Sequence, residues 1–92
     1  MKRKYRSKVG IILDILQSID YLEYNDGIAL LTKIMYRANL SYDRLIQYLN
    51  ELSSKGLITK SNDGYVLTRK GREFLENLLK VREFLRAFGF TL

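Results

Sequence analysis

Arg44, Gln47 and Asn50 follow one another at intervals of three residues and carry groups suited to reading nucleic-acid bases. An arginine can donate two hydrogen bonds to O6 and N7 of guanine, and the amide of glutamine or asparagine can pair with adenine in the major groove. The interval places all three on one side of a helix. Ser41 and Tyr42 precede them, where the start of that helix would meet phosphate or sugar. These five residues are therefore candidate contacts to DNA.

The composition argues against a catalytic site or a metal site. The chain has no cysteine and no histidine, which removes disulfides, thiolate metal sites, the usual zinc ligand and the commonest general base. Its acidic residues show no convergent spacing from which a carboxylate site could be built. We therefore expect no enzymatic activity, no metal, no cofactor and no small-molecule substrate.

Positive charge is concentrated in parts of the chain. The net charge is +6, from 16 Lys and Arg against 10 Asp and Glu. Residues 1–8 contain five of these basic residues and no acid, whereas residues 9–32 contain acids and no base. Such segregation is expected of a surface that meets phosphates, although charge that only keeps a protein soluble explains the total equally well. The candidate phosphate contacts are Lys2, Arg3, Lys4, Arg6, Lys33, Arg37, Lys60 and Asn62.

Two acidic residues, Asp43 and Glu51, interrupt the candidate base-reading surface. Phosphate would repel both of them. The mixed charge predicts modest sequence specificity, with most of the affinity coming from contacts to the DNA backbone.

Apolar periodicity and turn residues divide the chain into four helices and one hairpin. The expected helices span residues 7–19, a segment from Ile28 or Thr32 to about Ala38, residues 42–54 and residues 69–88, and the expected strands span residues 57–60 and 65–68. Residues 20–27 are expected to form a connection. Gly56 suits the left-handed position that follows a helix, and Gly64 suits a positive φ in the hairpin turn.

The order of these elements narrows the fold. The tight turn at residues 39–41 joins two helices into a helix-turn-helix, and the hairpin directly after the third helix is a wing. We therefore predict a mainly α fold with a small β-hairpin: a winged helix-turn-helix with three helices, a two-stranded wing and a long C-terminal helix. The predicted division is a flexible basic arm at residues 1–6, a winged domain at 7–68, and a dimerisation helix with an apolar tail at 69–92.

Several segments, in this order, resemble a family of small archaeal winged-helix proteins. They are residues 32–42, 48–49, 55–58 and 65–75, and the resemblance covers residue 4 to about residue 80. It implies a DNA-binding protein, either a transcription regulator or a chromatin-associated protein. It also implies dimerisation through a long C-terminal helix in an antiparallel coiled coil.

Two sets of apolar residues exceed what one small domain is expected to bury. The candidate dimer-interface residues are Ile11, Ile15, Phe74, Leu78, Val81, Leu85 and Phe88. Those in the last helix recur at alternating intervals of four and three, which is a heptad seam of about two repeats. The alternative is that this helix packs back on its own domain.

We therefore expect a homodimer that binds double-stranded DNA in the cytoplasm, at the nucleoid. The alternative is a winged helix that serves protein–protein contact without binding DNA. No apolar run approaches the ~20 residues that cross a bilayer. Asp14, Gln17 and Asp20 interrupt the apolar residues that follow the basic N-terminus, so neither a membrane span nor a signal peptide is expected.

Overall fold

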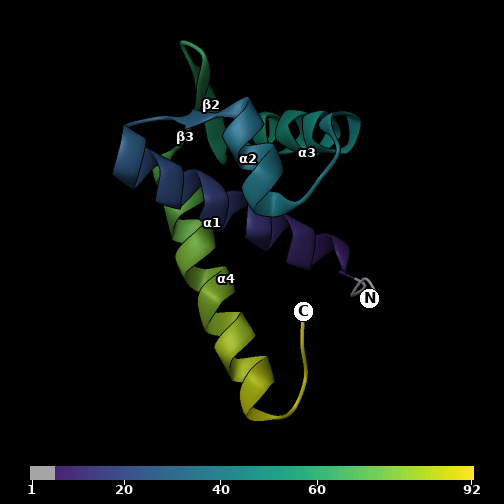
Figure 1. Cartoon of the computed structure of the whole chain (residues 1–92). Coiled ribbons are helices and arrows are strands. Elements are labelled where there is room, and N and C mark those ends of the chain that lie inside the picture. The colour runs from purple at the N-terminus through teal and green to yellow at the C-terminus, as the bar shows by residue number, and fades with distance from the viewer. Residues whose placement is uncertain (1–5) are drawn as a thin grey trace.

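Four helices pack beside a small sheet in the computed structural model, which describes residues 6–92 (Figure 1). In chain order the elements are α1 (Lys8–Asp26), β1 (Ala29–Leu30), α2 (Leu31–Ala38), α3 (Tyr42–Ser54), β2 (Ile58–Ser61), β3 (Gly64–Leu67) and α4 (Arg69–Ala87). The strands form one antiparallel sheet in the order β1-β3-β2. The hairpin of β2 and β3 projects beyond the helices as a wing. The predicted mainly α architecture with a wing after the third helix is confirmed.

Local capping confirms where α1, α3 and α4 begin. The hydroxyl oxygens of Ser7, Ser41 and Thr68 each accept a hydrogen bond from the backbone N–H three residues ahead, at 3.0, 3.3 and 3.0 Å. Such caps satisfy one of the free donors at a helix start and stabilise it by about 1 kcal/mol. After α3, Gly56 adopts the predicted left-handed conformation, with a φ of 76°.

α1 is longer than predicted. The segment expected to be a connection continues the helix as far as Asp26, and the chain leaves the helix only at Gly27, which has a φ of 83°. Leu22 is buried in the core, and the Glu23 carboxylate accepts a hydrogen bond from the backbone N–H of Leu67 at 3.1 Å. These contacts with distant parts of the chain extend the helix, so the turn residues mark only its end.

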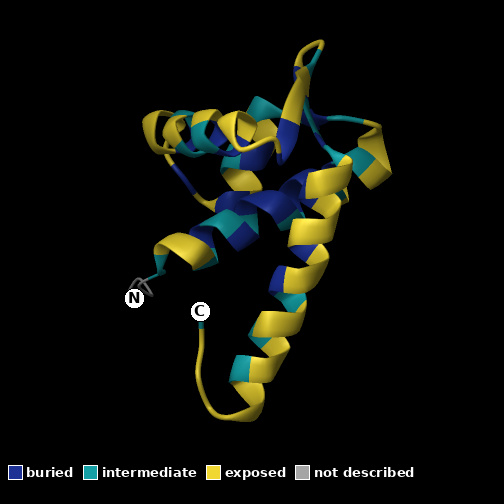
Figure 2. Cartoon of the chain, turned by 180° about the vertical axis from the view of Figure 1, so that it is seen from behind, coloured by how far each residue is buried: buried dark blue, intermediate teal, exposed yellow. Residues whose placement is uncertain are grey.

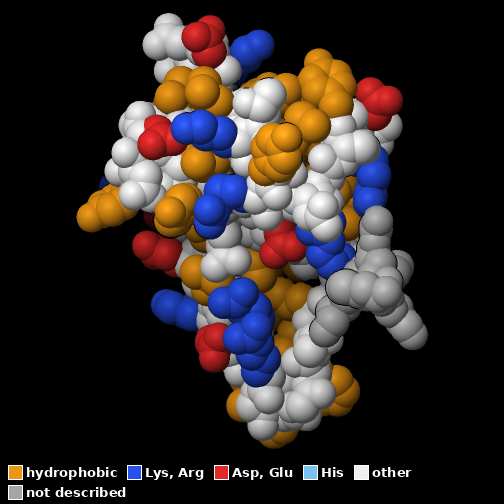
Figure 3. Space-filling view, in the orientation of Figure 1, with side chains coloured by type: hydrophobic (Ala, Val, Ile, Leu, Met, Phe, Trp, Pro, Cys, Tyr) orange, Lys and Arg blue, Asp and Glu red, His pale blue; other side chains and the backbone are white. Residues whose placement is uncertain are grey.

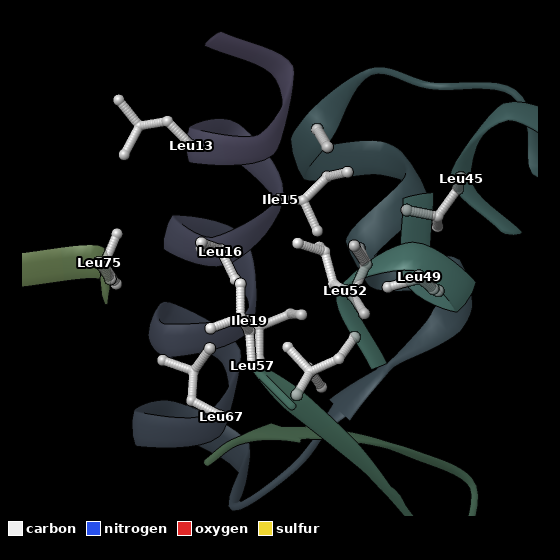
Figure 4. Packing of buried hydrophobic residues seen from close by; sticks show 14 of the residues in the cluster. Leu13, Ile15, Leu16, Ile19, Leu45, Leu49, Leu52, Leu57, Leu67 and Leu75 are labelled. Atoms are coloured by element: carbon white, nitrogen blue, oxygen red, sulfur yellow. The ribbon is translucent and has the colours of Figure 1, made fainter. Parts of the chain in front are cut away.

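α1 is buried on two sides by its own chain. Ile11 and Ile15 are 4% and 0% exposed, so the prediction that they face a partner subunit is wrong. Figure 4 shows Ile15 on the side of α3, toward Leu52, and Leu13 on the other side, toward Leu75 of α4. An apolar stripe on each side of a helix requires neighbours on both sides, and here α2, with α3 beyond it, and α4 supply them.

A third strand joins the hairpin. Residues Ala29 and Leu30 form β1, opposite Tyr65 and Gly64 of β3, so α2 begins at Leu31. The prediction of a positive φ at Gly64 is wrong, because Asn62 holds the left-handed position in the turn, with a φ of 52°. A Cβ atom at Gly64 would overlap the carbonyl oxygen of Ala29. The glycine is therefore needed for close approach of two strands.

α4 packs against α1 through its first half and then extends away from the domain (Figures 1 and 2). Leu75 and Leu78 are buried there, so Leu78 faces the protein's own core and the prediction that it contacts a partner subunit is wrong. The chain reverses at Gly89, which has a φ of 86°, and Leu92 packs against the core cluster. The tail therefore returns toward the start of α1. Within residues 6–92, none of the helices has the length and apolar character needed to cross a membrane.

Candidate nucleic-acid interface

The exposed face of α3 carries the predicted base-reading side chains. Leu45, Leu49 and Leu52 are buried beneath the helix, and this orientation leaves Arg44, Gln47 and Asn50 exposed, as is Tyr42 at the helix start. The sequence periodicity alone specified this orientation, because the leucines at intervals of four and three define the inner face.

The turn between α2 and α3 holds the two helices in a fixed relationship. Asn39 adopts the left-handed conformation with a φ of 55°. Its backbone N–H donates to the carbonyl of Tyr36 at 3.3 Å, and the N–H of Leu40 donates to Met35 at 3.2 Å. Leu40 is buried. The predicted break at these residues is confirmed, and it places Ser41 at the start of α3.

Glu51 is accompanied by two lysines. The ammonium of Lys8 lies 3.3 Å from its carboxylate and that of Lys55 lies 3.7 Å away. Lys8, Arg44, Gln47 and Glu51 help to line a hollow of about 290 Å³ on this face. Lys8 was not among the predicted contacts. Its signal was its position at the end of the basic stretch, directly after the capping Ser7.

Arg6 is held by contacts with the folded domain and is not part of a flexible arm. One Nη atom of its guanidinium donates to Asp14 at 2.9 Å and to the carbonyl of Ala38 at 2.6 Å, and the other donates to the carbonyl of Asn39 at 2.9 Å. The prediction that it is a flexible phosphate contact is therefore wrong, because the side chain closes the C-terminal end of α2. The predicted contacts Lys2, Arg3 and Lys4 lie outside the described residues.

Lys33 and Arg37 contact α1. The ammonium of Lys33 lies 3.1 Å from the carboxylate of Asp26. The guanidinium of Arg37 stacks over the ring of Tyr21, 3.7 Å from its centroid. Arg37 borders a hollow between α1 and α4 that also includes Leu75. The structure therefore does not bring Arg37 to the α3 surface.

The wing places Lys60 and Asn62 in solvent. Asn62 lies in the turn between β2 and β3, and Figure 3 shows side chains of both charges at the tip. The two residues are thus available on an element that projects from the domain.

Two of the three basic residues at the start of α4, Lys70 and Arg72, contact other elements of the fold, and Arg72 makes ion pairs with α1. Its guanidinium lies 2.9 Å from the carboxylates of both Asp20 and Glu23 on α1. The hydrogen bond that Arg72 donates to Asp20 and the nearby charge of Glu23 raise the pKa of Arg72, against the effect of burial. The ammonium of Lys70 donates to the carbonyl of Lys55 at 3.0 Å. These two basic residues therefore hold elements of the fold together.

Comparisons with known proteins agree with this architecture. A family model described as winged helix-turn-helix matches residues 5–86. The chain is similar to two uncharacterised proteins of Methanocaldococcus jannaschii. It is 30% identical to one over 86 residues, covering 94% of this chain and 84% of that protein. It is 36% identical to the other over 76 residues, covering 83% of this chain but only 34% of that longer protein.

A solved structure is also similar. It is that of Sso10a-2, a DNA-binding protein from Sulfolobus solfataricus, with a TM-score of 0.61 and 29% identity, covering 89% of this chain and 87% of that one. The family model covers most of the chain, and the fold contains both a helix-turn-helix and a wing. The chain belongs to the winged helix-turn-helix family.

Proposed function

We propose that this protein binds double-stranded DNA, with α3 in the major groove and the wing over the neighbouring backbone. The observation that carries the proposal is the exposed face of α3, where Arg44, Gln47 and Asn50 project to solvent. The similarity to a DNA-binding protein of Sulfolobus solfataricus supports it. Arginine and amide side chains on such a helix match the donor and acceptor pattern of base edges.

Backbone contacts would supply most of the affinity. Lys8 lies beside α3 and Lys60 lies on the wing, and both are candidate phosphate contacts. Lys2, Arg3 and Lys4 remain candidates from the sequence. The paired position of Glu51 weakens its repulsion of phosphate, because two ammonium groups lie within 4 Å of it.

We further propose that the protein acts as a homodimer joined through α4. The exposed apolar side chains of this helix include Phe74, Val81 and Phe84, with Phe88 directly after its last turn, and Leu85 is partly exposed beside them. Phe84 and Phe88 lie against each other, with ring centroids 5.3 Å apart. An apolar stripe on a helix that extends from its domain suits an antiparallel partner helix. Such a dimer would present two α3 helices to one duplex.

The proposed role is that of a transcription regulator or chromatin-associated factor at the nucleoid, without enzymatic activity. The competing function is protein–protein contact alone, for which the same fold would serve. Direct binding measurements separate the two.

The test is a fluorescence anisotropy titration of a labelled duplex of about 30 base pairs at about 50 and about 200 mM salt. Binding should weaken steeply with salt, since each neutralised phosphate contributes about −0.9 to the slope of log K against log salt. A chain that is folded by circular dichroism and shows no binding at the lower salt would refute the proposal.

A further inference from the structure

A second basic site lies away from α3, where the end of α4 and the returning tail meet the start of α1. A hollow of about 330 Å³ is lined there by Arg6, Asp14, Arg82, Arg86 and Thr91, among others. Three arginines therefore line one space, one from directly before α1 and two from neighbouring turns of α4. Asp14 is the one acidic side chain that lines it, and its carboxylate is paired with Arg6 at 2.9 Å.

Arg82 is incompletely satisfied in this hollow. Its Nε atom is buried and has no hydrogen-bond acceptor among residues 6–92. The closest carboxylate oxygen, from Glu83, lies 3.9 Å away, which is too long for a hydrogen bond. A buried donor without an acceptor leaves the cost of removing it from water uncompensated. The hollow is therefore bordered by an arginine whose buried donor an incoming acceptor would satisfy once the side chain turns.

We propose that this arginine pocket binds a small oxyanion, a phosphate or pyrophosphate group that is free or carried by a small molecule. Guanidinium groups offer parallel N–H donors that match the oxygens of such an anion, and they remain charged at every physiological pH. The volume lies at the lower end of the range for small-molecule sites. The bound anion accepts hydrogen bonds from the guanidinium groups of Arg82 and Arg86, and Arg82 turns so that its Nε takes part.

The pocket also touches the DNA-binding unit. Arg6, which lines it, donates to the carbonyls of Ala38 and Asn39 at the end of α2. These residues begin the turn of the helix-turn-helix. An anion held beside Arg6 therefore stabilises the same guanidinium that closes this turn. Binding of the anion is predicted to raise the melting temperature of the protein, by linkage.

The test is calorimetric titration of inorganic pyrophosphate into the full chain, without DNA, at about 150 mM salt. Saturable binding is expected for the unaltered protein. Arg82→Gln and Arg86→Gln should each weaken it by about tenfold or more, as for the loss of a charge-assisted hydrogen bond. Arg69→Gln is the matched control, because it removes the same charge from an exposed position at the other end of α4, and it should bind like the unaltered protein.

Each contrary outcome is decisive. The absence of saturable heat for the unaltered protein would overturn the proposal, and so would an equal loss of binding in Arg69→Gln. If Arg82→Gln does not fold, Arg86→Gln and the pyrophosphate-dependent rise in melting temperature carry the test. Duplex affinity should be the same in Arg82→Gln and Arg69→Gln. A selective loss of duplex affinity in Arg82→Gln would instead assign the pocket to a DNA phosphate and overturn its assignment to a small ligand.

Discussion

The ammonium of Lys8 lies 3.3 Å from the carboxylate of Glu51, so the first turn of α1 and the exposed face of α3 share an ion pair. This contact joins a residue of the basic N-terminal stretch to one of the two acidic residues on the proposed DNA-binding face of α3. Removing the charge of Glu51 should therefore change the affinity for DNA, because the loss of this charge both lowers the repulsion of phosphate and releases Lys8.

Glu51→Gln is expected to tighten duplex binding by about three- to tenfold at low salt, since one unfavourable charge disappears and one lysine becomes available to phosphate. Anisotropy titrations measure the change. Glu76→Gln removes the same charge from an exposed position on α4 and should alter affinity less than twofold. Equal tightening in both variants would show a general effect of net charge and contradict the proposed position of Glu51.

Lys60→Ala and Arg44→Ala should weaken binding in different ways. Loss of the wing lysine should lower affinity for all duplexes alike and reduce the magnitude of the salt slope by about 0.9 for each subunit. Loss of Arg44 should cost about 1–3 kcal/mol on the preferred sequence and less on others. Selection from random duplexes, followed by titration of selected and unselected sequences, distinguishes the two patterns. An identical effect of Arg44→Ala on every sequence would argue against base readout.

Val81→Glu should convert the proposed dimer to a monomer, because it places a charge within the apolar stripe of α4, where Val81 is 46% exposed. Light scattering at tens of micromolar protein measures the mass. Lys80→Glu introduces the same carboxylate at the neighbouring exposed position and should leave the dimer intact. An unaltered protein that already has the mass of one chain would refute dimerisation.

Substitution by alanine should lower the stability of the fold by different amounts at two glycines. A Cβ atom at Gly71 would overlap the carbonyl oxygen of Leu57, whereas one at Gly56 would meet only the Lys70 side chain at ordinary van der Waals distance, so Gly56 is constrained only by its φ of 76°. Gly56→Ala should therefore lower the free energy of unfolding by about 1–2 kcal/mol. Gly71→Ala should lower it by about 3 kcal/mol or more, because backbone must move. Urea unfolding compares them, and equal losses would contradict the close packing of α4 on the segment after α3.

The contribution of Arg72 to stability should not change between about pH 6 and about pH 9. The pKa of Arg72 is raised in the folded protein by Asp20 and Glu23, so the stabilisation is complete below the unfolded pKa and is lost only as pH rises through the folded value, far above neutrality. Arg72→Gln should cost about 1 kcal/mol at both pH values, the upper range for an exposed ion pair. Arg69→Gln is the control, and a loss that differs between the two pH values would contradict this origin.

The helix starts at Ser7, Ser41 and Thr68 and the inward face of α3 could be predicted from local residue patterns alone. Caps and apolar spacing act over a few residues, so they can be interpreted without knowing the rest of the chain. The base-reading candidates of α3 were predictable for the same reason, since the positions of its leucines specify which side chains must face outward.

Three features could be assigned only once the packing of the whole chain was known: what covers the second side of α1, why Gly64 is a glycine, and what Arg6 and Lys8 contact. Ile15 is buried by elements of its own chain, Gly64 is close-packed against Ala29, and Arg6 binds carbonyls 32 and 33 residues away. Each depends on which distant segments meet, and spacing along the chain does not specify those meetings. Burial and long-range hydrogen bonds therefore show that these residues stabilise the fold. From residue type alone, Ile15 had been expected to contact a partner subunit, Gly64 to form a turn, and Arg6 to contact DNA.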